Sequence, residues 1–343
     1  MIRKPEPLLI TGVFRSGTTL IAQIMNNHPD FSVIYDSVNF MRFSYKRYEI
    51  LSNFHNVENM VTEIHNRIMK RLELNFNKKK VLKDLKQIHN KKITYAIVYD
   101  AIMSDLLLKK SGKKHWGEKT NLVWTKIPNF FEMFPKGRVI HIQRDPRAII
   151  ASWKKFTYAP GINYLDGVFN CVDSMNTAKK YSKRFRNKRY CAIKYEDLVS
   201  NKEQTLKKVC KNLEIRYSKG MLDESKFRTQ KGNKWKGNSV FKKHIQGISK
   251  SFKDTWKRKL PEEDIYIIQF FCGDQMREFG YKKIKIKEDE ELLTTIKKKI
   301  LSSKLVSDGA LSWLFEKKGK ERYPNDPLDP QNWVENRIKG YER

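Results

Sequence analysis

Cysteines, acidic side chains and long apolar runs are scarce in this sequence, and each shortage excludes a class of protein. Only 4 of the 343 residues are cysteines, and they lie far apart, without the close pairs of metal sites and redox motifs. We therefore expect unpaired thiols that serve in packing, in a reducing compartment. The four are Cys171, Cys191, Cys210 and Cys272.

No apolar run approaches the roughly 18 residues of a membrane span. A strand-like segment already begins at Leu8, which leaves no room for the apolar region of a signal peptide. We therefore expect a cytoplasmic protein without a transmembrane segment, still able to contact a membrane surface. The sequence also contains no internal repeat and no helical His-Glu-His metal motif.

Acidic residues are outnumbered, with 38 Asp and Glu against 70 Lys and Arg, for a net charge of +32. Such a charge favours anionic partners, including nucleotides, acidic polymers, nucleic acid and anionic lipid. A Lys-, Asn- and Ile-rich composition is also typical of an AT-rich genome, in which many lysines are simply solvated. The charge therefore indicates the sign of a partner and leaves its identity open.

The periodicity of apolar residues predicts strands alternating with helices. A buried strand at residues 8–11 leads through a tight loop, residues 12–17, into a helix at residues 18–27. Further strands are expected at residues 138–143 and 190–194, and further helices at residues 146–155, 202–213 and 261–279. This alternation predicts an α/β fold, with a central parallel sheet flanked by helices on both faces.

Two segments fall outside that pattern. Residues 40–114 are predicted as a helical insertion, with helical patches at 57–74 and 93–108 and basic segments, including Lys78-Lys79-Lys80, between them. After Tyr281 the composition becomes acidic, then amphipathic, then rich in Pro and Asp. We predict one domain over residues 1–285 and a helical extension with a tail over 286–343.

Residues 12–19, GVFRSGTT, have the spacing of a phosphate-binding loop, GxxxxGK[ST]. Backbone N–H groups in such a loop and at the following helix N-terminus suit a phosphate or phosphosulfate. Thr18 replaces the Lys that a nucleoside triphosphatase uses on the β- and γ-phosphates. Arg15, within the loop, can supply the cation instead. The plain alternative is an ordinary tight turn.

The loop resembles that of the 3'-phosphoadenosine 5'-phosphosulfate-dependent sulfotransferase family, in which Arg15, Ser16, Gly17, Thr18 and Thr19 match the residues that grip the 5'-phosphosulfate. The resemblance extends over about residues 7–281. It implies a P-loop-like sulfotransferase fold and an enzyme that uses this nucleotide as co-substrate, with no metal.

A second segment, residues 140–153 (IHIQRDPRAIIASW), resembles the family's 3'-phosphate segment. Arg144 and Ser152 match the 3'-phosphate ligands there. Arg144 ends a strand, where α/β folds place ligands, and Ser152 lies about two helical turns further on. Arg147 can add charge. The alternative is a local Arg144–Asp145 ion pair.

Other matches to the family are shorter. Tyr195, in IKYEDL, corresponds to a position that often faces the cofactor. Ser239 and Lys250 lie in a segment similar to the loop that closes over the adenosine phosphate. Lys119, in WGEKT, corresponds to a Lys near the transferring group, and Asn121 stands where the family usually has Pro.

The family often has a carboxylate shortly after a His-Pro pair, which acts as general base on the acceptor hydroxyl. Here Asp36 follows His28-Pro29 at the position where the family commonly has Glu. Because Asp is one methylene shorter, Glu118 is the alternative base. The implied reaction is an in-line displacement at sulfur, in which Arg15 and Lys119 neutralise developing charge.

The acceptor hydroxyl is left open between a peptide tyrosine, a glycan, a lipid and a small alcohol, and the basic excess favours an acidic acceptor. Variable loops, expected at residues 40–114 and 160–180, would form its pocket. Two other functions stay in competition. A P-loop kinase or other nucleotide-binding protein is disfavoured by Thr18, and a nucleic-acid or membrane-surface binding protein has no dedicated motif here.

Overall fold

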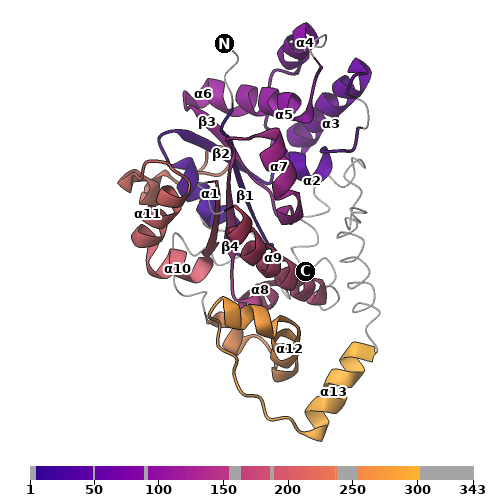
Figure 1. The fold of residues 1–343 in the computed structure, drawn as a ribbon, viewed down its shortest axis with the longest axis vertical. Coiled ribbons are helices and arrows are strands. Elements are labelled where there is room, and N and C mark those ends of the chain that lie inside the picture. The colour runs from indigo at the N-terminus through magenta and orange to yellow at the C-terminus, as the bar shows by residue number, and fades with distance from the viewer. Residues whose placement is uncertain are drawn as a thin grey trace.

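The computed structural model describes residues 5–48, 51–88, 92–153, 164–185, 189–235, 237 and 254–301. Its centre is a five-stranded parallel sheet with the order β2-β3-β1-β4-β5 (Figure 1). The strands are β1 (Leu8–Gly12), β2 (Phe31–Tyr35), β3 (His115–Lys119), β4 (Arg138–Gln143) and β5 (Tyr190–Lys194). The predicted α/β class, with a parallel sheet and flanking helices, is confirmed.

Helices cover both faces of the sheet, so its strands are buried on both sides. Successive side chains alternate between faces: Leu8 and Ile10 belong to one buried cluster, and Leu9 belongs to the other. The first face is covered by α1 (Thr18–Asn26), α10 (Tyr195–Ser200) and α11 (Lys202–Asn212). The second is covered by α7 (Ile127–Met133), α8 (Pro146–Trp153) and α9 (Tyr164–Arg184).

Residues 160–180, which we expected to form a variable loop, belong largely to helix α9 in the part that is described. This helix contacts α8 and α12 and buries Val168, Cys171 and Met175 in the core. The apolar residues repeat at helical spacing and find a packed surface, so the expectation of a loop was wrong.

The segment between β2 and β3 is helical, as expected, and lies at one end of the molecule (Figure 1). It comprises α2 (Phe40–Phe43), α3 (Phe54–Leu72), α4 (Lys78–Ile88), α5 (Tyr95–Met103), a π-helical turn (Ser104–Leu108) and α6 (Lys109–Ser111). The basic run that starts at Lys78 forms the first turn of α4 instead of a connection. Val81 and Leu85, one turn apart, are buried and hold it there.

The opposite end carries the 3₁₀ turn Thr255–Arg258, α12 (Glu262–Glu278) and α13 (Glu290–Leu301). Ile296 of α13 is buried against the core. The domain boundary at 285/286 stays a prediction, and residues 302–343, Ser239 and Lys250 lie outside the described residues. Within the described ranges, no helix combines the length and apolar character needed to cross a bilayer.

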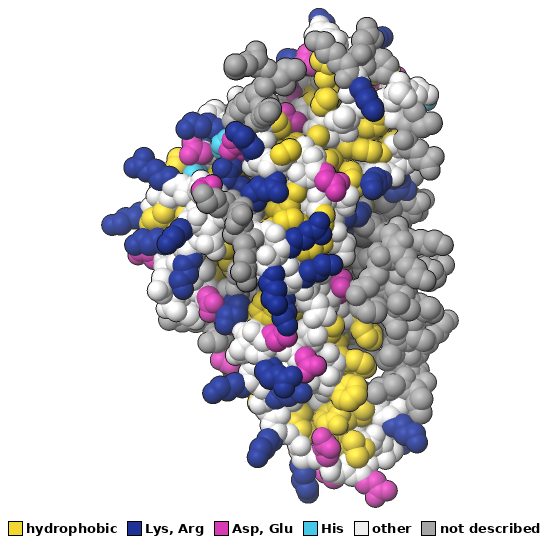
Figure 2. Space-filling model, in the orientation of Figure 1, with side chains coloured by type: hydrophobic (Ala, Val, Ile, Leu, Met, Phe, Trp, Pro, Cys, Tyr) yellow, Lys and Arg dark blue, Asp and Glu magenta, His cyan; other side chains and the backbone are white. Residues whose placement is uncertain are grey.

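The four cysteines are all buried and unpaired, which confirms the expectation of packing thiols. Lys and Arg side chains are spread over the face seen in Figure 2, with acidic side chains among them. On that face the described basic residues are not gathered into one continuous groove.

Candidate active site

The carboxyl ends of parallel strands meet at one edge of a sheet, which is where α/β folds bind ligands. The strand order brings five predicted elements to this edge in succession. They are Asp36 after β2, Lys119 at the end of β3, the loop of residues 13–17 after β1, Arg144 after β4 and Tyr195 after β5.

The loop of residues 13–17 turns through two left-handed residues, Arg15 (φ 71°) and Gly17 (φ 99°). Ser16 is buried, and both its N–H (3.1 Å) and its hydroxyl (2.7 Å) donate to the Val13 carbonyl, so its side chain shapes the loop. A Cβ on Gly17 would lie 2.4 Å from Cδ2 of Tyr195, so only glycine fits against that ring.

Thr18 and Thr19 open helix α1, which has no acidic residue in its first turn. Gly17, as the N-cap, has no side chain to accept from the first N–H groups. A helix N-terminus of this kind favours an anion.

The second predicted motif contacts this loop directly. Arg15 Nε donates to Ser152 Oγ at 2.9 Å, although the residues are 137 positions apart in sequence. Arg144 Nη1 donates to the Arg15 carbonyl at 2.8 Å, and its guanidinium lies 4.2 Å from the ring centroid of Tyr195. The two motifs that the sequence analysis singled out are therefore in direct contact.

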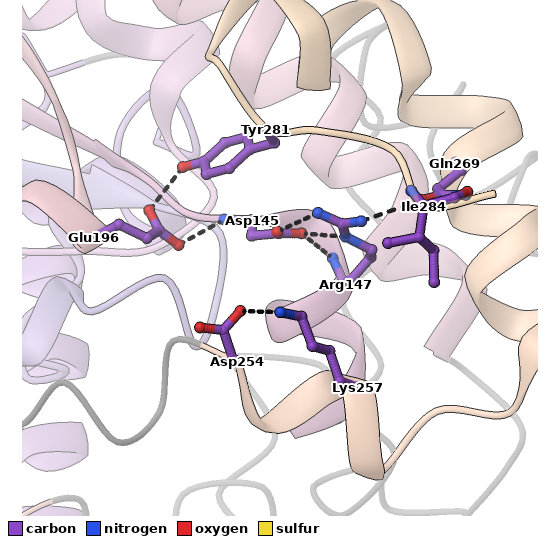
Figure 3. Close-up of polar contacts among 8 residues, drawn as sticks. All are labelled: Asp145, Arg147, Glu196, Asp254, Lys257, Gln269, Tyr281 and Ile284. Atoms are coloured by element: carbon purple, nitrogen blue, oxygen red, sulfur yellow. Dashed lines mark hydrogen bonds and ion pairs between the residues drawn. The ribbon is translucent and has the colours of Figure 1, made fainter.

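Arg147 does not turn its charge toward this site. Its Nε and Nη2 donate to Asp145 at 3.0 and 2.7 Å, and its Nη1 donates to Gln269 Oε1 at 3.1 Å (Figure 3). Its guanidinium also lies 3.9 Å from the ring of Trp256. The ion pair of this segment thus joins Asp145 to Arg147, and Arg144 is held by other contacts.

Glu196, just after Tyr195 on helix α10 (Tyr195–Ser200), supports the same turn. Its Oε1 accepts from the Asp145 N–H at 3.1 Å, and its Oε2 accepts from the Tyr281 hydroxyl at 2.8 Å (Figure 3). Burial raises the pKa of this carboxyl. The segment that carries Arg144 is therefore fixed by side chains from α10, α12 and the residues after α12.

We predict that Arg147→Ala lowers the free energy of unfolding by about 3–5 kcal/mol, because it leaves the Asp145 carboxylate buried without its partner. The side chains of this pair are 4% and 9% exposed. Urea denaturation measures the loss. Lys257→Ala is the matched control, because its 3.1 Å pair with Asp254 is 56% and 59% exposed and worth about 1 kcal/mol or less. Equal losses in the two variants would contradict this assignment.

Lys119 and Asp36 form an ion pair at the other end of the site. Lys119 Nζ lies 2.8 Å from both carboxylate oxygens of Asp36. The Lys119 side chain is 2% exposed, whereas that of Asp36 is 36% exposed. Asp36 has a left-handed backbone (φ 50°), and its N–H donates to the Lys119 carbonyl at 3.2 Å. The Asp36 carboxylate is thus accessible to solvent, whereas the Lys119 ammonium that it contacts is buried.

Glu118 points to the opposite face from Lys119, because side chains alternate along β3. It is fully buried and accepts from the N–H groups of Asn39 and Phe40 and from the Tyr99 hydroxyl. Burial raises the pKa of this carboxyl. Glu118 thus holds the start of α2 in the core, and of the two carboxylates only Asp36 is open to solvent.

The comparison with known sequences decides the family. The sequence profile of the Sulfotransferase family matches residues 7–219, more than half of the 343-residue chain. This chain belongs to the sulfotransferase family.

Individual relatives are more distant. Carbohydrate sulfotransferase 1 of Danio rerio is 27% identical over 172 residues, covering 44% of this chain and 40% of that protein. The chain thus spans about two fifths of the length of this curated relative. Two solved structures are similar in fold, each at 18% identity over 82% of this chain. They are the sulfotransferase domains from the curacin biosynthetic pathway (TM-score 0.53, 100% of that chain) and the Synechococcus PCC 7002 olefin synthase (0.55, 96%).

Several residues that hold this candidate site together were not predicted from the sequence. Trp153 Nε1 donates to the Phe14 carbonyl at 3.0 Å and so adds a further link between the two motifs. Glu196 and Tyr281 hold the segment of Arg144, and no local pattern indicated this. Asn121 accepts from the hydroxyl of Thr18, the first residue of α1. The only sequence signal for it was its departure from the family's usual Pro.

Proposed function

We propose that this chain transfers a sulfuryl group from 3'-phosphoadenosine 5'-phosphosulfate to a hydroxyl of an acceptor. The observation that carries the proposal is the contact between the loop and the second motif, through Arg15–Ser152 and Arg144–Arg15. A phosphate-binding turn alone serves many proteins. A second cationic segment against it suits a ligand with phosphate at both ends of a nucleoside.

The residues present fit such a ligand. Backbone N–H groups of residues 17–19, at the N-terminus of α1, would bind the 5'-phosphosulfate, together with the hydroxyls of Thr18 and Thr19. Ser16 would shape the loop around it through its bonds to the Val13 carbonyl. Arg144 and Ser152 would bind the 3'-phosphate, and Tyr195 would border the nucleotide. Charge-assisted hydrogen bonds from two guanidinium groups complement these anions without further cations.

In the reaction, Asp36 takes the proton of the acceptor hydroxyl, and the acceptor oxygen attacks sulfur. The bond between sulfur and the 5'-phosphate oxygen breaks, and adenosine 3',5'-bisphosphate leaves with the electron pair. Arg15 and Lys119 neutralise the charge that develops on the sulfuryl and phosphate oxygens. The 2.8 Å contacts of Lys119 with Asp36 support a shared role for these two residues.

The acceptor is proposed to be a peptide tyrosine, a glycan, a lipid or a small alcohol, with acidic examples favoured by the net charge of +32. The helical segment between β2 and β3 follows Asp36 directly in the chain and is expected to supply the acceptor pocket. A cytoplasmic location stays part of the proposal.

Transfer of labelled sulfate from the donor to a panel of these acceptors tests the proposed reaction. Absence of both transfer and adenosine 3',5'-bisphosphate binding would contradict the proposed function.

We predict that adenosine 3',5'-bisphosphate binds without a divalent metal, because arginines and backbone donors occupy the role that Mg²⁺ has in triphosphate chemistry. Calorimetry should give the same dissociation constant with excess EDTA as with added Mg²⁺. ATP is the control ligand. Binding of ATP that needs Mg²⁺, with no binding of the bisphosphate, would favour a P-loop kinase instead.

A further inference from the structure

Asn121 lies in the turn after β3, two residues beyond Lys119. Asn121 is 3% exposed, as is Thr18, the first residue of α1. The Thr18 hydroxyl donates to Asn121 Oδ1 at 3.0 Å. This is a contact between a residue outside the loop and the residue that replaces the Lys of the GxxxxGK[ST] pattern.

The backbone around Asn121 is held against β1. The N–H of Thr120 donates to the Ile10 carbonyl at 2.9 Å, and the N–H of Leu122 donates to the Gly12 carbonyl at 3.3 Å. Leu122 has a left-handed backbone, with φ 61°. The turn therefore presents the Asn121 amide to the start of α1 at a fixed place.

A side-chain amide has a hydrogen-bond acceptor and a donor on one planar group. The proline that the family usually has at this position has neither. A buried hydroxyl such as that of Thr18 needs a partner whether or not a ligand is present. Asn121 Oδ1 provides such a partner, because it accepts from the Thr18 hydroxyl at 3.0 Å. A half-turn of the amide lets Nδ2 donate to Thr18 Oγ1, and the single hydroxyl proton of Thr18 can then point to an anion.

We propose that Asn121 is a positioning residue for the donor nucleotide: it directs the Thr18 hydroxyl proton toward the 5'-phosphosulfate and satisfies that hydroxyl when no donor is bound. This role rests on the proposed function, because it needs an anion in the loop. It acts on the 5' end of the nucleotide alone, since Arg144 and Ser152 are the residues assigned to the 3'-phosphate.

Calorimetry with two nucleotides tests the role. Adenosine 3',5'-bisphosphate carries both phosphates, and adenosine 3'-phosphate lacks the one that Thr18 would contact. Asn121→Ala should weaken binding of the bisphosphate about 3- to 10-fold, the factor of one neutral hydrogen bond, and leave adenosine 3'-phosphate binding unchanged. Asn129→Ala, on helix α7, is the matched control and should change neither affinity.

A double-mutant cycle separates this role from simple support of the turn. Thr18→Val should weaken bisphosphate binding, and Thr18→Val with Asn121→Ala should be no weaker than Thr18→Val alone. Equal losses for both nucleotides, or additive losses, would overturn the proposal.

Thr18→Ser, which keeps the hydroxyl, should bind nearly as the unsubstituted protein does. If Asn121→Ala does not fold, an unchanged bisphosphate affinity in Thr18→Val overturns the proposal by itself. An unsubstituted protein that binds neither nucleotide would instead overturn the proposed function, and the role of Asn121 with it.

Discussion

Asp36→Asn should lower kcat by about 10²–10⁴-fold, the usual contribution of a general base, while the affinity for adenosine 3',5'-bisphosphate is unchanged. The carboxylate lies at the carboxyl edge of the sheet, 36% exposed and within 2.8 Å of Lys119. Asn keeps an oxygen that accepts from the Lys119 ammonium, so the buried cation retains a partner. Steady-state sulfate transfer measures kcat, and calorimetry measures the nucleotide affinity.

Glu118→Gln is the control for this prediction. Glu118 is fully buried and accepts from Asn39, Phe40 and Tyr99. Replacing its carboxylate with the Gln amide should therefore lower the free energy of unfolding. Transfer per folded molecule should persist. A variant of Asp36 with near-normal turnover, beside an inactive Glu118→Gln that still binds nucleotide, would make Glu118 the base.

Arg144→Ala should weaken binding of the 3'-phosphorylated nucleotide much more than binding of adenosine 5'-phosphosulfate, which lacks the 3'-phosphate. The expected difference is about 1.5–3 kcal/mol, the range of a hydrogen bond to a charged group, or roughly 10- to 150-fold in the dissociation constant. Competition calorimetry with the two ligands measures it.

Arg144 also donates to the Arg15 carbonyl at 2.8 Å and lies over the ring of Tyr195. Part of the loss will therefore reflect a loosened loop and fall on both ligands. Arg147→Ala provides the comparison, because it disturbs the same segment from within the buried network. Its losses should be equal for the two nucleotides. If Arg144→Ala also weakens binding of both nucleotides equally, Arg144 has only a structural role.

The strands β1, β4 and β5 agree with the sequence prediction to within one residue, because each is a short apolar run beside a turn signal. The strands β2 and β3 were not predicted. Strand β3 places Glu118 and Lys119 in the sheet interior, and charged side chains normally argue against a buried strand. The structure makes this acceptable through distant partners, Tyr99 for Glu118 and Asp36 for Lys119.

Local sequence alone was enough to indicate the loop of residues 12–19, the segment that carries Arg144 and Ser152, and the family. These are contiguous patterns in which spacing reflects backbone geometry, so one chain segment contains the signal. The choice between Asp36 and Glu118 depends instead on burial, which is a property of side chains far apart in sequence. The same holds for Asn121, whose partner Thr18 lies on helix α1. Arg147 pairs with Asp145 in its own segment, but Gln269 on α12 and the ring of Trp256 also hold its guanidinium. Only tertiary packing decides whether a charge or an amide faces the ligand site or the core.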